Sequence, residues 1–298
     1  MKTAFPGRAA VCGILALFAT MLAATSAQAA RVGVLSNNYA AATAADFGSK
    51  IPGHVFTGVD TSAGVPTLSS LTGSFDVLLV FEDGAFVNST AVGNVAAAFA
   101  DVGRPVILGT FYDQDRSDVN NPALTNQAHG WGALEAIDPN TTDGIGVPTG
   151  ATGIPNLPRV LNVATLVSHP LTSGVTALGA TSGFAGGNQA KVGTVVLANW
   201  TEPNARALPD PAIAYRMTGI ACVIQIGIAP DYAVGMGTGY GAFTGDFYVV
   251  WKNAFDFAGS SCGVGKPIPT LSEGGIALTV LLICAFAFSQ RRRIVRRR

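Results

Sequence analysis

Two uninterrupted apolar runs in the first half of the chain constrain its fold more than any other feature. They lie within residues 76–81 (DVLLVF) and 105–110 (PVILGT), and residues 90–102 between them have the apolar spacing of a helix. A strand that is apolar on both faces needs a covering layer on each side, as in a parallel sheet flanked by helices. The order strand, helix, strand therefore predicts a parallel unit with a right-handed crossover.

The same alternation starts earlier and becomes irregular later. Residues 31–35 and 54–59 are predicted strands and 40–50 a helix, while Asn88 or Ser89 is placed to cap the helix 90–102. Residues 139–158 are rich in Gly, Pro and Thr and predict a long surface insertion. Three further strands, for which an antiparallel arrangement is one option, are expected at 192–200, 212–215 and 220–226, before a closing helix at 245–259. The predicted fold class is α/β, a mostly parallel sheet flanked by helices with added β segments in the C-terminal half.

This order of elements resembles the flavodoxin-like, class I glutamine-amidotransferase-like fold, including its trehalose-utilisation-type branch. The residues that carry the resemblance are the strands 76–81 and 106–109, the segment 169–175 (HPLTSGV), Asp246, and Lys252, Asn253 and Ala254. Active members have a cysteine nucleophile at the turn after the second of these strands, where this sequence has Phe111. The resemblance therefore implies the fold without amide hydrolysis by that mechanism.

The N-terminal 29 residues have the three parts of a secretory signal peptide. Lys2 and Arg8 form the basic region, residues 9–24 are apolar, and residues 27–29 (AQA) form the cleavage site, so the mature chain is expected to begin near Ala30 or Arg31. The alternative is a retained anchor helix. Signal peptidase is the expected partner at this end.

The C-terminal residues 263–298 form a linker followed by a segment with a membrane-anchor pattern. Fourteen uncharged residues, 275–288, would make a helix of roughly 21 Å, shorter than the ~30 Å apolar core of a bilayer. The six arginines that follow suit an anionic cytoplasmic leaflet; they are Arg291, Arg292, Arg293, Arg296, Arg297 and Arg298. We expect residues 271–298 to insert into the membrane; the alternative is a core helix with a solvated basic tail.

This tail resembles the IPTL-CTERM protein-sorting domain of Gram-negative bacteria. The matching residues are Ile268, Pro269, Thr270, Leu271 and Glu273, while Gly274 stands where the family usually has Trp. The resemblance implies that an exosortase-like membrane enzyme removes the tail and that the protein moves on to the cell surface or the extracellular space.

The region between the two ends, residues 30–262, is predicted to be one domain. Residues 31–266 contain ten Lys or Arg and seventeen Asp or Glu, a net charge of −7. A nucleic-acid partner is therefore not expected, since little would neutralise phosphates. The only cysteines in this region are Cys222 and Cys262, which in an oxidising compartment are expected to form a disulfide; two buried free thiols are the alternative.

Acidic residues follow the two central strands. In an open parallel sheet, ligands bind beyond the carboxyl ends of the strands. The candidate catalytic residues there are Glu82, Asp83, Asp113 and His129, a set that could serve acid and base chemistry on a sugar. Asp113, Asp115 and Asp118 are also candidate calcium ligands, although they lack the Gly and Glu of the helix-loop-helix calcium site. Solvated acidic loops remain the simpler interpretation, and no cofactor is predicted.

The sequence supports two hypotheses of different classes. The first is an exported, non-catalytic binding or structural module of the envelope or matrix, whose ligand the sequence does not name. The second is an exported hydrolase, directed at carbohydrate, that uses the acidic strand ends.

Overall fold

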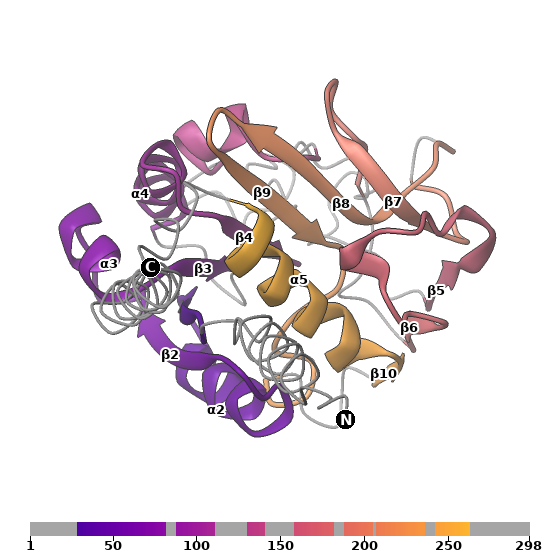
Figure 1. Cartoon of the computed structure of the whole chain (residues 1–298), viewed down its shortest axis with the longest axis horizontal. Helices are drawn as coiled ribbons and strands as arrows, with labels where there is room; N and C mark the ends of the chain where they lie inside the picture. The colour runs from indigo at the N-terminus through magenta and orange to yellow at the C-terminus, as the bar shows by residue number, and fades with distance from the viewer. Residues whose placement is uncertain are drawn as a thin grey trace, which may run out of the picture.

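A single ten-stranded sheet runs through the residues that the computed structural model describes (Figure 1). These are residues 29–81, 88–110, 130–140, 158–181, 188–204, 207–235 and 242–262. The strand order is β10-β6-β5-β7-β8-β9-β4-β3-β1-β2. The sheet is mixed, with a parallel half from β9 to β2 and an antiparallel half from β10 to β9.

The bounds of the elements are as follows. The strands are β1 (Arg31–Ser36), β2 (Val55–Asp60), β3 (Val77–Val80), β4 (Val106–Gly109), β5 (Arg159–Asn162), β6 (Leu178–Ala180), β7 (Val195–Trp200), β8 (Pro211–Thr218), β9 (Ala221–Ile226) and β10 (Phe243–Gly245). The α-helices are α2 (Ala40–Lys50), α3 (Leu68–Ser74), α4 (Ser89–Asp101) and α5 (Phe247–Ser261). The 3-10 helices are η1 (Gly132–Ala136), η2 (Val163–Thr165) and η3 (Pro170–Thr172).

The parallel half has helices on both faces, because its connections run in two directions. The chain passes from β1 through α2 to β2 on one side, and from β3 through α4 to β4 on the other. Right-handed crossovers in opposite directions place α2 on one face and α3 and α4 on the other. Helix α5 joins α2, since the Phe47 ring of α2 lies 5.7 Å from the rings of both Trp251 and Phe255.

The expectation of a mostly parallel sheet was wrong, although the α/β class is confirmed. Five of the nine strand pairings in the described residues are antiparallel. For the pairing of β8 with β9 the reason is local: only Gly219 and Ile220 separate the two strands, and Gly219 has a φ of +57°. A two-residue turn can join antiparallel neighbours only, whereas a parallel pair needs a long crossover.

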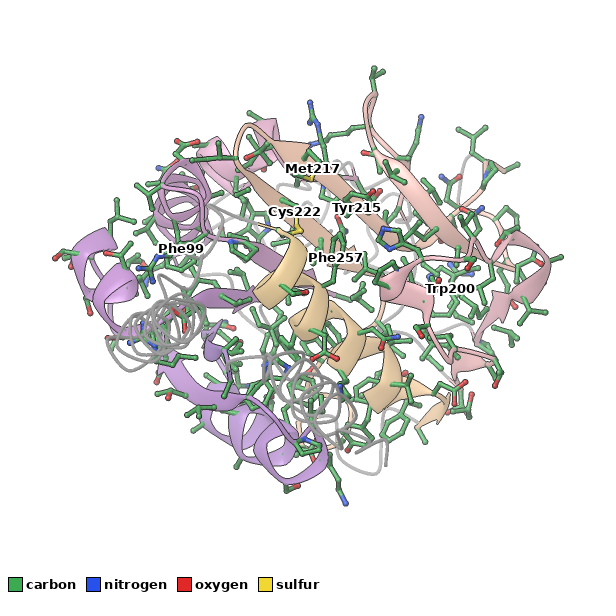
Figure 2. All side chains as sticks on the ribbon, in the orientation of Figure 1. Phe99, Trp200, Tyr215, Met217, Cys222 and Phe257 are labelled. Atoms are coloured by element: carbon green, nitrogen blue, oxygen red, sulfur yellow. A yellow bond between two sulfur atoms is a disulfide. The ribbon has the colours of Figure 1, made fainter. Side chains whose placement is uncertain are left out.

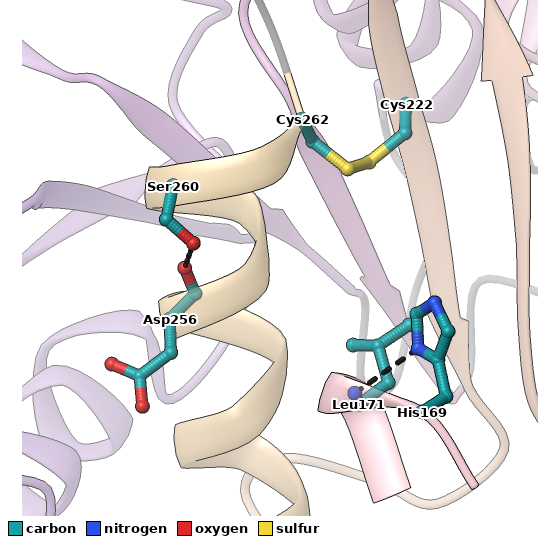
Figure 3. The surroundings of a disulfide bond; sticks show 6 residues. All are labelled: His169, Leu171, Cys222, Asp256, Ser260 and Cys262. Atoms are coloured by element: carbon teal, nitrogen blue, oxygen red, sulfur yellow. Dashed lines mark hydrogen bonds between the residues drawn. A yellow bond between two sulfur atoms is a disulfide. The ribbon is translucent and has the colours of Figure 1, made fainter.

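The covalent link between sheet and closing helix is a disulfide from Cys222 on β9 to Cys262 at the end of α5 (Figure 3). Its two Cα atoms are 5.3 Å apart and both side chains are buried. Tyr215 and Phe257 lie close to this link, with ring centroids 5.6 Å apart (Figure 2). Because Cys222 bonds to the end of α5 and side chains alternate along a strand, the even-numbered residues of β9 face α5 and the odd-numbered residues face the side of α4.

Candidate functional site

The carboxyl ends of the parallel strands form the edge at which the sequence predicts a site. β1 and β3 are neighbours whose following connections cover opposite faces, so the switch point of the sheet lies between them. β3 and β4 are paired in parallel, and the segments that follow them both start at this edge. Those segments carry the candidate residues Glu82, Asp83, Asp113, Asp115, Asp118 and His129, all of which lie outside the described residues.

Tyr39 marks the carboxyl end of β1. The Ser36 hydroxyl accepts the Asn38 N–H at 3.3 Å, and the Asn38 side-chain oxygen accepts the Tyr39 N–H at 3.0 Å. Tyr39 then opens α2 in the left-handed region, with a φ of 55°, and its carbonyl accepts the Thr43 N–H at 2.8 Å. A bulky residue in this region is strained, and such strain is concentrated at ligand sites.

Three further segments meet this corner. The Thr61 N–H after β2 donates to the Ser36 carbonyl at 2.9 Å, and the Asn88 side chain before α4 donates to the Thr61 carbonyl at 2.8 Å. After β9, the Asp231 carbonyl accepts the Gly235 N–H at 2.7 Å. A Cβ added to Gly235 would lie 2.7 Å from the Tyr39 ring and 2.6 Å from the Asp231 carboxylate. Loops after β1, β2 and β9 are thus held against one another.

The end of β4 is the position of the nucleophile in the resembled family. A Cβ added to Gly109 would lie 2.6 Å from Pro230 and 3.3 Å from the Trp251 ring, so the strand is packed tightly on the α5 side. The Thr110 N–H donates to the Ile228 carbonyl at 3.3 Å, and the buried Thr110 hydroxyl has no hydrogen-bond partner. Phe111 itself lies outside the described residues.

The charge at the described part of this edge is fixed by local contacts. Asp60, which ends β2, accepts the Ser62 N–H at 2.8 Å, and hydrogen bonding from Ser62 holds its pKa below the usual range. Asp60 is therefore a carboxylate at neutral pH. Within the described ranges, no group of three His, Cys, Asp or Glu side chains could hold a metal ion.

Two residues that carry the family resemblance have structural positions away from this edge. The Nδ1 atom of His169 accepts the Leu171 N–H at 3.2 Å (Figure 3). The His169 ring stacks on Tyr215, with ring centroids 5.2 Å apart. Burial lowers the pKa of His169, which favours the neutral ring that this bond requires. Asp246 accepts the N–H groups of Thr176 and Ala177 at 2.7 and 3.0 Å. Both residues hold the segment 169–177 against α5.

A second group of buried polar side chains, over β5, β7 and β9, was not predicted from the sequence. Its members are Arg159, Asn188, Trp200, Asp210 and Gln225, which we call the buried polar cluster. One signal was available: Gln225 is the only polar residue in the otherwise apolar strand β9, apart from its cysteine. Among the predicted sites, only the cysteine pair falls within the described residues.

Comparison with known proteins gives a family only for the tail. The family model of the IPTL-CTERM motif matches residues 266–293. The chain therefore carries the sorting motif of exported, surface-directed proteins. This motif implies processing by an exosortase-like enzyme. No curated protein matches the sequence. No helix within the described ranges has the length and apolarity to cross a bilayer; the tail lies outside those ranges.

Among solved structures, the chain is similar to two proteins of Salmonella typhimurium. Cytoplasmic Protein STM3548 has a TM-score of 0.50 at 12% identity, covering 78% of this chain and 98% of that one. Cytoplasmic Protein STM1381 has a TM-score of 0.46 at 11% identity, covering 76% and 98%. Agd3, a carbohydrate deacetylase, has a TM-score of 0.34 at 14% identity, covering 67% of this chain and 30% of that one. The first similarity concerns the fold alone, and none of the three is described as an amidotransferase.

Proposed function

We propose that residues 30–262 form a non-catalytic binding module of the envelope or extracellular matrix, exported by the signal peptide and sorted by the tail. In this proposal signal peptidase removes residues 1–29, and residues 271–298 hold the protein in the inner membrane until an exosortase-like enzyme cleaves it. The ligand binds at the carboxyl edge, beside Tyr39.

The observation that carries this proposal is the strained Tyr39 corner. The surrounding hydrogen bonds of Ser36, Asn38 and Thr61 keep a non-glycine residue at a φ of 55°. Such conformations persist only where the neighbouring structure enforces them, and they cluster at active sites and ligand-binding sites. The groups that the described part presents here are mostly hydroxyls and amides, which suit binding better than bond cleavage. Phe111 at the nucleophile position agrees with this.

A binding assay on the exported protein tests the proposal. Envelopes and matrix polysaccharide from the producing bacterium are incubated with the parent, with Tyr39→Gly, and with Tyr248→Phe as a matched control on α5. Glycine accepts the positive φ without strain, so Tyr39→Gly keeps the backbone while removing the ring. We expect binding by the parent and the control, and a loss of about tenfold for Tyr39→Gly, about 1.4 kcal/mol. Equal binding by all three would refute the site.

A hydrolase is the second candidate, favoured by the parallel pairing of β3 and β4. Because both strands end at one edge, the chain segments carrying Glu82, Asp83 and Asp113 start side by side. Glycoside turnover by the parent and by Asp113→Asn separates the two functions. A substrate that the parent hydrolyses and Asp113→Asn does not would favour the enzyme; equal rates in both would remove Asp113 from it.

A further inference from the structure

One face of the antiparallel half of the sheet lies open beside α5. Helix α5 packs over β9, β4 and β3. The Tyr215 ring on β8 contacts the Phe257 ring of α5, so Met217, two residues further along β8, points to the same side of the sheet as α5. Met217 is 53% exposed. The described helices therefore leave this part of the face uncovered.

Three more side chains extend this open face. Val195 of β7 is paired with Tyr215 and is 43% exposed, and paired residues lie on the same face of a sheet. The His169 ring stacks on Tyr215, and His169 and Val167 both line an open groove of about 660 Å³ along residues 166–174. We call Val167, His169, Val195, Tyr215 and Met217 the apolar strip. Contiguous exposed apolar side chains of this kind indicate a docking surface.

The apolar strip starts beside the point where the chain leaves the described domain. Met217 is paired with Cys222, which is bonded to Cys262 at the end of α5. Tyr215, Met217 and Cys222 lie next to one another near this end of the helix (Figure 2). The Cα atoms of the two cysteines are 5.3 Å apart. With the usual spacing of a ladder pair and of consecutive residues, the Cα atom of residue 263 lies within about 15 Å of Met217.

The sequence that follows has the chemistry that suits such a surface. Residues 264–271 read VGKPIPTL and carry a single charge, on Lys266. Lys266 and Ile268 each precede a proline, which favours an extended, polyproline-like backbone. Such segments bind aromatic grooves at low entropic cost, and proline has no N–H that binding would bury. At about 3.1 Å per residue the segment spans roughly 25 Å, enough to pass from Met217 over Tyr215 to His169.

We propose that residues 264–271, which contain the sorting motif at 268–271, dock on the apolar strip of the same molecule. The disulfide anchors Cys262 beside the strip, so the segment is present there at an effective concentration on the order of millimolar, and modest apolar contacts are sufficient. Docking covers Met217 and Val195 and holds the sorting motif on the folded domain. The strip is separate from the proposed ligand site, since Tyr39 follows β1 in the parallel half of the sheet.

Site-specific photo-cross-linking of the uncleaved, membrane-bound protein tests this proposal. A benzoylphenylalanine residue replaces Met217 in one sample and Val55 in the other. Val55 is the matched control because it is 57% exposed and lies on the edge strand β2. Products with the mass of one chain are digested and mapped by mass spectrometry. We expect the probe at position 217 to cross-link within residues 264–271, and the probe at position 55 to give at least tenfold less of this product.

Substitutions in the segment distinguish docking from simple proximity of the tail. Ile268→Asp places a charge against the apolar strip and should lower the cross-linking yield at least tenfold, whereas Lys266→Gln should cross-link as the parent does. Tyr39→Gly should also leave the yield unchanged, so the result does not depend on the proposed ligand site. The proposal is overturned if position 217 cross-links to a second copy, to lipid or to another protein instead, or to nothing. A yield that Ile268→Asp does not change would overturn it as well.

Discussion

Removal of the disulfide should cost more stability than most single changes in this protein. Cys222 and Cys262 are separated by 40 residues, and the bond closes a loop that contains β10 and all of α5. Cross-linking a loop of this length lowers the entropy of the unfolded chain enough to stabilise the fold by about 4 kcal/mol. For a domain of this size, that loss should lower the melting temperature by about 8–16 °C.

The suitable variant is the double substitution Cys222→Ala and Cys262→Ala. Alanine leaves no free thiol, and it avoids the buried unpartnered hydroxyl that serine would place at Cys222, which is 0% exposed. The helix keeps its aromatic packing, because Trp251 and Phe255 still contact Phe47. The variant should therefore fold, with reduced stability.

Equilibrium unfolding in urea, followed by tryptophan fluorescence, measures the effect. The parent is compared with the double variant, in buffer with and without a reductant. Reduction should lower the stability of the parent to about that of the variant and leave the variant unchanged. A loss below about 1 kcal/mol, far under the loop-entropy value, would mean that the cross-link does not stabilise the fold in this way. So would a reduced parent that stays as stable as the oxidised one, since the cross-link would then contribute nothing.

Three further predictions concern titration and packing. Burial and then the hydrogen bond to Asp46 raise the pKa of Tyr248 to about 12. The stability that Tyr248 contributes is therefore complete below pH ~10 and is lost as the pH rises towards the folded pKa. An ultraviolet titration should show one tyrosine that ionises at unusually high pH, and Tyr248→Phe should remove this signal. Partial burial opposes ionisation of Asp76, but hydrogen bonds and charge from Arg31 outweigh it and lower its pKa, so its contribution is present above pH ~4 and lost in acid. Because this pair is exposed, Asp76→Asn should cost less than ~1 kcal/mol in urea unfolding at pH 7. Trp251→Ala should cost about 3–5 kcal/mol, measured in the same way.

Each of these has an outcome that contradicts it. A titration of Tyr248→Phe identical to that of the parent would mean that another tyrosine titrates late. Parent and Asp76→Asn should have equal stability at pH 2; a difference that persists there would not come from the ionised carboxylate. Trp251→Phe retains most of the buried ring and should cost much less than Trp251→Ala, so equal losses would point to something other than cavity size.

The parallel half of the sheet was predictable because its strands are buried on both faces. The runs 76–81 and 105–110 contain β3 and β4, and the helix expected at 40–50 coincides with α2. Burial on two faces produces a continuous apolar run, which a sequence displays directly. Asn88 precedes α4 as expected, but its side chain bonds to the Thr61 carbonyl instead of capping the helix.

The antiparallel half was harder to predict because its pairing depends on short elements. β6 and β10 have three residues each, too few to show a period, and they pair through contacts between residues more than sixty positions apart. His169 and Asp246 were visible as motif residues, yet their contacts give them a structural role in the segment before α5. A motif fixes which residues occur together, whereas the direction of each side chain depends on the packed neighbours.

Only part of the candidate site could be predicted from the sequence, for the same reason. The rule that ligands bind beyond the carboxyl ends of parallel strands located the edge from sequence. It did not single out Tyr39, because a positive φ depends on the hydrogen bonds that Ser36 and Asn38 make after folding. Asn188 and Trp200 come together with Gln225 from separate segments, and no local pattern links them.

In the proposed function, the tail delivers a folded binding domain to the outside of the cell. The intact mass of the protein from the membrane fraction and from the exported fraction tests it most directly. We expect an exported form that begins near Ala30 and ends before the apolar residues 275–288, together with a membrane-bound form that still carries the terminal arginines. An exported form that retains the whole tail to Arg298 would contradict it.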